Sequence, residues 1–267
     1  MTEPTSSVRV DDWDKHWSEH ATSNALNPAQ AYRRMLIFGA LGLDASPTPA
    51  RVLEIGSGQG ELSSEIARLH PKVDLLGIDL SHTGVAITQA KVPGGAFFQQ
   101  DLREPISVPS RYHGWATHAV CSEVLEHLDD PVACLRNVRA CLAPGAKLVV
   151  TVPGGPVSAF DRHIGHRAHF TRARLEKVLL DAGFQVDAVH GSGFPFFNLY
   201  RLAVVARGKR LIADAETDLR GSARLGVWLF SRLFRMNKAR GTHGWQLLAV
   251  AREPARSTTS QSSAQAT

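Results

Sequence analysis

The sequence is poor in cysteine and has no long uninterrupted apolar run. Only three cysteines occur in 267 residues, at positions 121, 134 and 141, and their spacing fits no metal-ligand pattern. So few thiols suit a reducing compartment. The longest apolar-biased stretch, residues 193–206, contains Arg201 and falls short of the ~20 residues that a membrane-spanning helix needs. We therefore expect neither a disulfide framework nor a transmembrane segment.

The two ends of the chain also lack particular signals. Residues 1–16 have no basic start followed by an apolar centre, so no signal peptide is expected and a cytoplasmic location is predicted. Residues 252–267 offer nothing to bury and are predicted to be disordered. An apolar content of 43% suffices for one core with additions. The predicted parts are a helical lid, a ligand-binding core, an insertion and a final core strand, at residues 1–45, 46–194, 195–241 and 242–251.

Positive charge is concentrated late in the chain. Residues 162–240 hold 15 Lys and Arg against 6 Asp and Glu, whereas residues 1–161 hold 13 against 18. A local excess of this kind can meet phosphates, an anionic membrane surface or nucleic acid, or it can form a solvated basic face. The charge pattern alone does not decide between these partners.

Strand-like and helix-like segments alternate along the chain. Apolar strand patterns cover residues 52–55, 73–79, 96–101, 115–124, 146–152, 184–191 and 244–251. Helical patterns cover residues 28–43, 59–70, 81–91, 130–142 and 171–183, and the insertion is expected to be mostly helical. This alternation predicts an α/β fold with a seven-stranded, mostly parallel sheet covered by helices on both faces and an antiparallel last strand.

A glycine-rich turn follows the first predicted strand. Gly56, Gly58 and Gly60 stand at every second position before an amphipathic helix. A dinucleotide fingerprint would need its third glycine where Glu61 stands, and the turn also lacks the Lys and Ser/Thr of a phosphate-binding loop. Glu54, directly upstream, would repel a pyrophosphate. These departures favour an adenosine ligand without phosphates.

Two further acids end the next two predicted strands. Asp79 lies 23 residues beyond Gly56, where a carboxylate can accept hydrogen bonds from both hydroxyls of a ribose. Asp101 ends the third strand, where a carboxylate can accept from an adenine amino group. Ligands of open α/β sheets bind beyond the carboxyl ends of the strands. Glu54, Asp79 and Asp101 are therefore expected together at that edge of the sheet.

Several stretches together resemble the Rossmann-like class I S-adenosylmethionine-dependent methyltransferases, in particular the small-molecule branch that includes quinone-biosynthesis methyltransferases. The motifs are VLEIGSGQG, GIDLS, QQDLRE, CSEVLEHLDDP, LRNVRACLAPGAKLVVTVPG and HFTRARLEKVLLDAGF. The resemblance implies S-adenosyl-L-methionine as cofactor. It also implies that the methionine part would be lined by Glu54, Gly56, Ser57, Gly58 and Gly60, and the ribose by Asp79 and Leu80. The adenine would meet Asp101 and Leu102, and the sulfonium would face Cys121, Ser122 and Glu123.

Histidines are the candidate catalytic groups. A hydroxyl or phenol acceptor must lose a proton, and His suits that role near neutral pH. We name His127, His163 and His166 as candidates, although the alternative for His127, as a structural residue or a pocket wall, is favoured. Three histidines at every third position would drift around a helix, and only Asp161 accompanies them, so no metal is expected. Arg162 and Arg167 are instead expected to anchor an anionic acceptor.

The insertion interleaves aromatic, apolar and basic residues. This pattern favours a wall of the acceptor pocket and a small, hydrophobic or lipid-linked acceptor, with peripheral contact to the inner face of a membrane through residues 195–240. A helical cap with outward basic side chains gives the same pattern. Two other functions stay open: a tRNA or rRNA methyltransferase, although nucleic acid is not the expected partner, and an inactive cofactor-binding regulatory protein.

Overall fold

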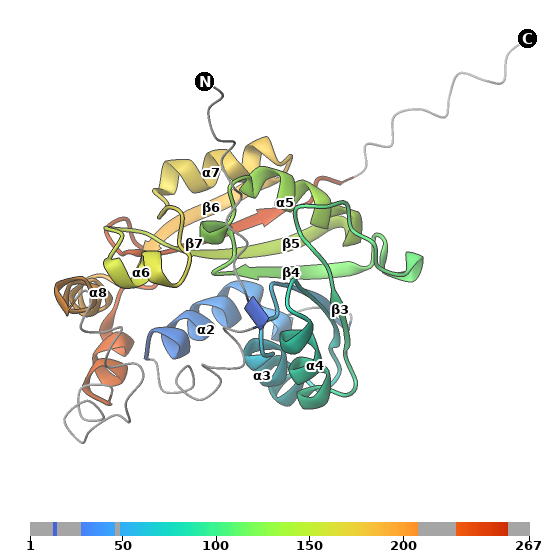
Figure 1. The fold of residues 1–267 in the computed structure, drawn as a ribbon, viewed down its shortest axis with the longest axis horizontal. Coiled ribbons are helices and arrows are strands. Elements are labelled where there is room, and N and C mark those ends of the chain that lie inside the picture. The colour runs from blue at the N-terminus through green and yellow to red at the C-terminus, as the bar shows by residue number, and fades with distance from the viewer. Residues whose placement is uncertain (1–12, 15–27, 46–48, 208–227, 256–267) are drawn as a thin grey trace, which may run out of the picture.

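The centre of the computed structural model, which describes residues 13–14, 28–45, 49–207 and 228–255, is a seven-stranded sheet. The strand order is β3-β2-β1-β4-β5-β7-β6 (Figure 1). The strands are β1 (Arg51–Ile55), β2 (Asp74–Asp79), β3 (Ala96–Gln99), β4 (Ala116–Ser122), β5 (Leu142–Pro153), β6 (Gln185–Ser192) and β7 (Gln246–Arg252). Neighbours from β3 to β5 are parallel, and β7 is antiparallel to β5 and β6. The predicted sheet is confirmed.

Helices cover both faces of this sheet, as the alternation of the sequence predicts. In Figure 1, α5 and α7 lie on one side, and α2, α3 and α4 lie on the other. The helices are α2 (Pro28–Leu41), α3 (Glu61–Leu69), α4 (His82–Lys91), α5 (Pro131–Val138), α6 (Ala159–His163), α7 (Arg172–Asp181) and α8 (Phe196–Arg207). Two apolar cores follow, one on each face. Along β1 the side chains alternate between them, since Leu53 belongs to one core and Val52 to the other.

Local caps fix where the helices begin. The hydroxyl of Ser81 accepts a hydrogen bond from the Gly84 amide at the start of α4. Asp130 caps α5 in the same way, with Pro131 in the first turn. Gly60, with φ 75°, stands at the N-cap of α3. The helices α3, α4 and α5 therefore begin at residues on the carboxyl edge of the sheet.

The strand order reverses between β1 and β4, which places a switch point at the end of β1. From β1 the chain passes to β2 and β3 on one side, whereas β4 and β5 continue on the other. A crevice between outward-diverging connections is where open α/β sheets bind ligands. The glycine turn, residues 56–60, leaves β1 at this point.

The segment after β5 differs from the expected one. β5 begins at Leu142 rather than at Ala146, because Leu142 already pairs with Ala116 before a register shift. The histidine-rich segment forms only the short helix α6, which ends at His163. His166 and His169 therefore stand on an irregular segment instead of continuing around a helix.

The described parts of the insertion are helical. They comprise α8, a further helical stretch from residue 228 and a 3-10 turn over Phe234–Met236. In Figure 1, α8 lies at one end of the molecule, beside α6. Residues 208–227 and 256–267, which include most of the tail predicted to be disordered, lie outside the described residues. Among the helices described, none has the length and apolar character to cross a membrane.

Candidate active site

The turn after β1 can hold only glycine at two positions. Gly56 and Gly60 both have φ 75°, which L side chains rarely adopt. A Cβ on Gly56 would overlap the side chain of Val124, and one on Gly60 would meet Thr88. The turn is therefore packed closely between the residues that follow β4 and α4.

Asp79 locks this turn to the end of β2. Its Oδ2 accepts a hydrogen bond from the Gly58 amide at 2.7 Å, and its Oδ1 accepts from the Ser81 amide at 2.8 Å. Burial raises the pKa of Asp79, and the two amide hydrogen bonds oppose that shift. Each carboxylate oxygen keeps a further lone pair, so the pair can also accept from the vicinal hydroxyls of a ribose.

Glu54 lies beneath the turn, out of water. Its carboxylate accepts a hydrogen bond from the Ser63 hydroxyl on α3. Burial raises the pKa of Glu54 to about 8, the Ser63 hydrogen bond opposes this, and the charge of Asp79 adds to it. In the ligand-free protein this acid is protonated or weakly ionised. A positively charged ligand nearby would favour its ionised form, so the site suits a cationic ligand.

Asp101 follows β3, and its carboxylate is already paired. Arg103 donates from Nη2 at 2.6 Å and from Nε at 2.9 Å, and the hydrogen bonds of Arg103 lower the pKa of Asp101. Leu102 is buried in one apolar core, and its carbonyl accepts from Asn137 at 3.0 Å. The carbonyl of Leu80 accepts from Gln99 at 3.1 Å. These residues stand on the same edge as Asp79, as the sequence predicts.

The end of β4 presents Ser122 and Glu123. The Ser122 hydroxyl lies 2.9 Å from that of Thr151. Glu123 has φ 57°, and its carboxylate receives Arg33 at 3.0 Å and Gln246 at 3.0 Å. The thiol of Cys121 packs within an apolar core, and burial raises its pKa well above the ordinary value. The expectation that Cys121 faces the ligand therefore holds at most for its backbone.

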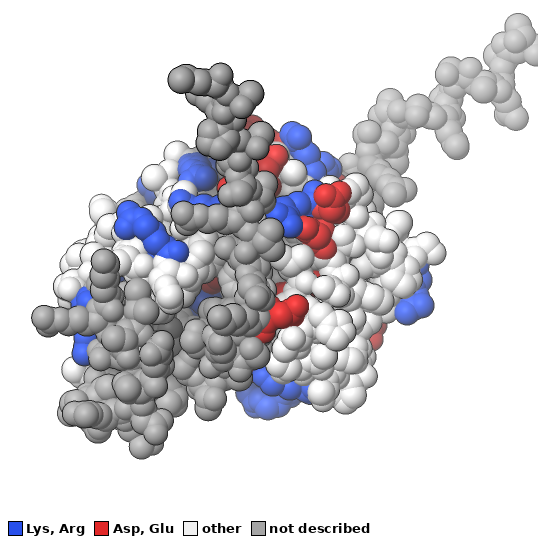
Figure 2. Space-filling view, in the orientation of Figure 1, with Lys and Arg blue, Asp and Glu red and all other residues white. Residues whose placement is uncertain are grey.

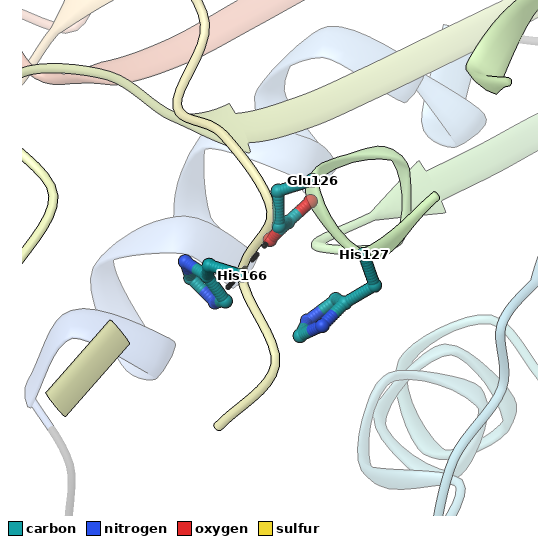
Figure 3. Close-up of side chains that lie close together, drawn as sticks. All are labelled: Glu126, His127 and His166. Carbon is teal, nitrogen blue, oxygen red and sulfur yellow. Dashed lines mark ion pairs between the residues drawn. The ribbon is translucent and has the colours of Figure 1, made fainter. Parts of the chain in front are cut away.

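The candidate catalytic histidines divide into a pair and an outlier. His127 and His166 meet edge to face with ring centroids 4.7 Å apart, and Figure 3 shows both beside Glu126. His163, at the end of α6, is exposed. Nothing in the described structure brings its ring to the other two.

The sequence did not single out one buried carboxylate, that of Glu126. Glu126 is fully buried beside His127, with its Oε1 4.0 Å from His166 Nε2 (Figure 3). Burial, with the neighbouring charge of Glu123, raises the pKa of Glu126 well above its ordinary value. Glu126 belongs to the quoted stretch CSEVLEHLDDP, but only burial distinguishes it there from Glu123.

Residues of the loop after α6 hold His127 and His166 in place. Burial, followed by the charge of His127, lowers the pKa of His166, and burial also lowers the pKa of His169. Arg167, expected as an anion anchor, instead donates to the His127 carbonyl and pairs with Asp129. Arg162 is exposed.

Trp13 and Asp14 connect the two halves of the edge. The Asp14 carboxylate accepts from the Ser81 hydroxyl at 2.5 Å and from the Thr83 amide at 2.9 Å. Trp13 contacts the His127 ring edge to face, with centroids 4.8 Å apart. One dipeptide thus touches both the ribose-side turn and the histidine pair.

The fold is Rossmann-like, and the glycine turn and Asp79 stand together at its switch point. A family model described as a methyltransferase domain matches residues 29–189, more than half of the chain, and the chain belongs to this family. The protein is a methyltransferase for small molecules, and S-adenosylmethionine is its methyl donor. The glycine turn, Asp79 and the buried Glu54 fit that donor, since they offer ribose acceptors and an acid but no phosphate cradle.

Named relatives share this family. The chain is 33% identical over 199 residues to a ubiquinone biosynthesis O-methyltransferase of Xanthomonas oryzae pv. oryzae (strain PXO99A), covering 67% of this chain and 79% of the relative. Identity to the enzyme of the same name in Xanthomonas axonopodis pv. citri (strain 306) is 28% over 174 residues, or 59% and 72% of the two chains.

Solved structures share the fold at low identity. Phosphoethanolamine N-methyltransferase 2 of Haemonchus contortus, in complex with S-adenosyl-L-methionine, aligns with a TM-score of 0.57 and 17% identity. The alignment covers 92% of this chain and 60% of that one. The names of these relatives do not favour the nucleic-acid or the regulatory alternative.

Proposed function

We propose that the protein methylates an oxygen of a small acceptor whose body is hydrophobic or lipid-linked. The observation that carries this proposal is the set of exposed apolar side chains on the insertion, whose helix α8 is joined to α6 by the Arg201–Asp161 ion pair. Leu199 and Leu202 on α8 are 53% and 47% exposed, and Trp228 and Leu229 in the second helical stretch are 55% and 48% exposed. Large apolar side chains gathered on one segment are typical of a surface that meets an apolar ligand or a lipid.

The other side of the insertion is anchored in the core. Phe197 and Phe234 are buried, and their rings pack at a tilt against that of Tyr32 on α2, at centroid separations of 5.7 and 5.5 Å. The insertion is therefore a packed part of the domain with an apolar outer surface. The packing on the core agrees with a helical cap, and the exposed apolar side chains support the proposed contact with an apolar acceptor or a lipid.

Basic residues accompany the apolar surface. Arg232 lies over the ring of Trp228 at 5.4 Å. On the face drawn in Figure 2, by contrast, Lys and Arg stand in separate patches interspersed with acids, over the described residues. A local pairing of aromatic and basic side chains fits an anionic lipid headgroup better than a nucleic-acid backbone, which a continuous basic stripe would follow.

The chemistry needs alignment and one proton acceptor. When bound, S-adenosylmethionine supplies an electrophilic methyl group on a sulfonium. Transfer of that methyl group would leave S-adenosylhomocysteine, and the acceptor oxygen would have to give up its proton. We assign that proton to His127, which contacts Trp13 and His166 from the 3-10 turn Leu125–His127 after β4. The relatives named O-methyltransferases support oxygen as the atom.

Trp13, Asp14 and α2 support a lid over this site. Arg33 of α2 reaches Glu123 at the end of β4, and Asp14 reaches Ser81. Closure by such contacts would exclude water from the sulfonium and from the acceptor oxygen. Residues 1–12 and 15–27 of the proposed lid lie outside the described residues.

An acceptor panel tests the function. S-adenosylhomocysteine release should be measured with phenols that carry short and long alkyl tails, with polar carboxylic acids and with tRNA. Turnover should rise with tail length, and His127→Asn should lower kcat while cofactor affinity is kept. Preference for polar acids or for tRNA would contradict the proposal.

Vesicle flotation tests the lipid contact with a matched control. The double variant L199S/L202S should lose binding to vesicles that contain anionic lipid. Leu180→Ser should keep it, since Leu180 is equally exposed at 53% but lies on α7, away from the insertion. Equal binding by both variants, or none by the wild type, would refute a lipid role for α8.

A further inference from the structure

The loop after α6 folds back so that three metal-ligand types meet. Asp161 on α6, His166 and His169 each bring one ligand atom within 4.8 Å of the others. His166 Nδ1 and His169 Nε2 are 3.1 Å apart, and the two Asp161 oxygens lie 3.9 Å from the first and 3.7 Å from the second. Two nitrogens bound to one tetrahedral Zn²⁺ would be about 3.4 Å apart. The spacing is thus close to that of a ligand set.

The second nitrogen of His169 is already engaged in the manner of a metal ligand. His169 Nδ1 lies 3.1 Å from the Gly155 carbonyl oxygen. A carbonyl can only accept, so Nδ1 carries the proton and the lone pair of Nε2 faces His166 and Asp161. Ligating histidines commonly donate their outer N–H to a backbone carbonyl or a carboxylate in this way.

Asp161 is oriented by two donors. The Ser158 amide donates to its Oδ2 at 2.7 Å, and Arg201 of α8 lies 2.8 Å from the same oxygen. Both donors act on Oδ2, which leaves Oδ1 directed at His166 Nδ1. A carboxylate held so firmly, and only 1% exposed in its side chain, presents one oxygen to the cluster at a fixed position.

Glu126 provides an independent observation. It is fully buried, and neither carboxylate oxygen has a hydrogen-bond partner within the described part of the chain. Its Oε1 points at His166 Nε2 from 4.0 Å (Figure 3). An unpartnered buried carboxylate is costly unless something compensates it. A divalent ion on His166 Nδ1 would do so, because the imidazole would then offer its Nε2–H to Glu126.

We propose that Asp161, His166 and His169 bind one divalent first-row transition-metal ion, with Glu126 as the outer acceptor for His166. Two imidazoles and a carboxylate suit Zn²⁺ and its neighbours in that row. Glu126, His127 and His166 form a second group within 4.8 Å, but there the carboxylate is 4.0 Å from the imidazole nitrogen and has no orienting donor in the described structure. The Asp161 group is the better ligand set.

The sequence argument against a metal no longer applies to this group. It rested on histidines that drift around a helix, whereas the helix ends at His163. The loop beyond it brings His166 and His169 back to Asp161 on α6 and brings His166 near the distant Glu126. Three protein ligands leave a further position for water or for an oxygen of the acceptor.

Metal titration of the untagged, full-length chain tests the proposal. After removal of metal with a chelator, calorimetry with Zn²⁺ should show saturable binding of about one ion per chain. Co²⁺ as a spectroscopic probe should give absorption typical of nitrogen and oxygen ligands without thiolate. His166→Asn and His169→Asn should each lose the saturable site, and Glu126→Gln should weaken Zn²⁺ by roughly 10–100-fold.

His163→Asn is the matched control, because His163 lies in the same segment but is exposed. It should bind Zn²⁺ as the wild type does. Unchanged S-adenosylmethionine affinity in each variant would show that the fold is kept. Absence of saturable Zn²⁺ binding by the wild type would overturn the proposal, and so would wild-type affinity in His169→Asn. Metal binding is read directly, so its failure would leave the proposed methyl transfer standing.

Discussion

The guanidinium of Arg201 on α8 lies 2.8 Å from the carboxylate of Asp161 on α6, and both side chains are largely shielded from water. Burial alone would raise the pKa of Asp161, but the hydrogen bond and charge of Arg201 bring it below the ordinary value. One ion pair thus joins the insertion to the histidine loop. The proposed acceptor wall and the candidate metal ligands share this contact.

Removing Arg201 should destabilise the protein strongly. Arg201→Met leaves a buried carboxylate without its counter-charge, which typically costs about 3–5 kcal/mol. Urea unfolding measures the loss. Arg252→Met is the control, because Arg252 pairs with Asp187 at the surface with side chains 47% and 38% exposed, and such pairs contribute no more than about 1 kcal/mol. Equal losses in the free energy of unfolding would show that the buried Arg201–Asp161 pair stabilises the protein no more than the surface pair does.

Asp79→Ala and Gly58→Val should each abolish measurable S-adenosylmethionine binding in calorimetry. The first removes the proposed ribose acceptor and the anchor of the Gly58 amide, and the second places a branched side chain in the turn. Asp74→Asn, at the exposed start of the same strand, should bind normally. Near-normal affinity in both site variants would refute the assignment of the cofactor site.

The stability of the ligand-free protein should depend on Glu54 and on pH. Burial raises the pKa of Glu54 from 4.5 to about 8. Between these values the folded protein keeps a proton that the unfolded chain has lost, so stability falls as pH rises through this window. The slope from this group can reach about 1.4 kcal/mol per pH unit. Glu54→Gln cannot ionise and should lack that part of the slope.

Urea unfolding at about pH 5, 7 and 9 would compare the two proteins. They should differ least at the lowest pH, and the variant should be the more stable at the highest. Parallel profiles would mean that Glu54 ionises in the folded state at its ordinary pKa.

Asp14→Ala should speed cofactor release. The substitution removes the acceptor of the Ser81 hydroxyl and the Thr83 amide, and with it the contact of the proposed lid with α4. Stopped-flow displacement of S-adenosylmethionine should give a larger dissociation rate, and Glu176→Ala on the exposed face of α7 should not change it. An unaltered rate in Asp14→Ala would argue against a lid at this point.

The cofactor half of the site is readable from the sequence, because its parts are local. Glycines at fixed spacing, and an acid at the end of each strand, report positions on a parallel sheet whose edge is set by topology. Gly56, Gly60 and Asp79 accordingly stand where they are expected. The sequence does not reveal that the carboxylate of Asp101 is paired with Arg103, because two residues of separation on a loop specify no side-chain geometry.

The histidine side of the site, where we propose that the acceptor binds, depends on contacts between segments that are distant in the sequence. Glu126 and His166 are 40 positions apart, and only the reversal after His163 brings them together. The sequence argument treats the histidines, which are three positions apart, as part of one helix, whereas the helix ends at His163 and Gly165, with φ 89°, follows it. Arg201 likewise belongs to a segment predicted as an insertion, and its partner in α6 follows from tertiary packing.

The position of β7 has a consequence for how the protein is made. β7 lies between β5 and β6, and its Gln246 donates to Glu123 beside the glycine turn. Strand β6 has β7 as its neighbour in the sheet, so it cannot join before the residues up to 252 have been synthesised. On the ribosome, the cofactor half could fold early, whereas the site becomes complete only when the last strand leaves the exit tunnel.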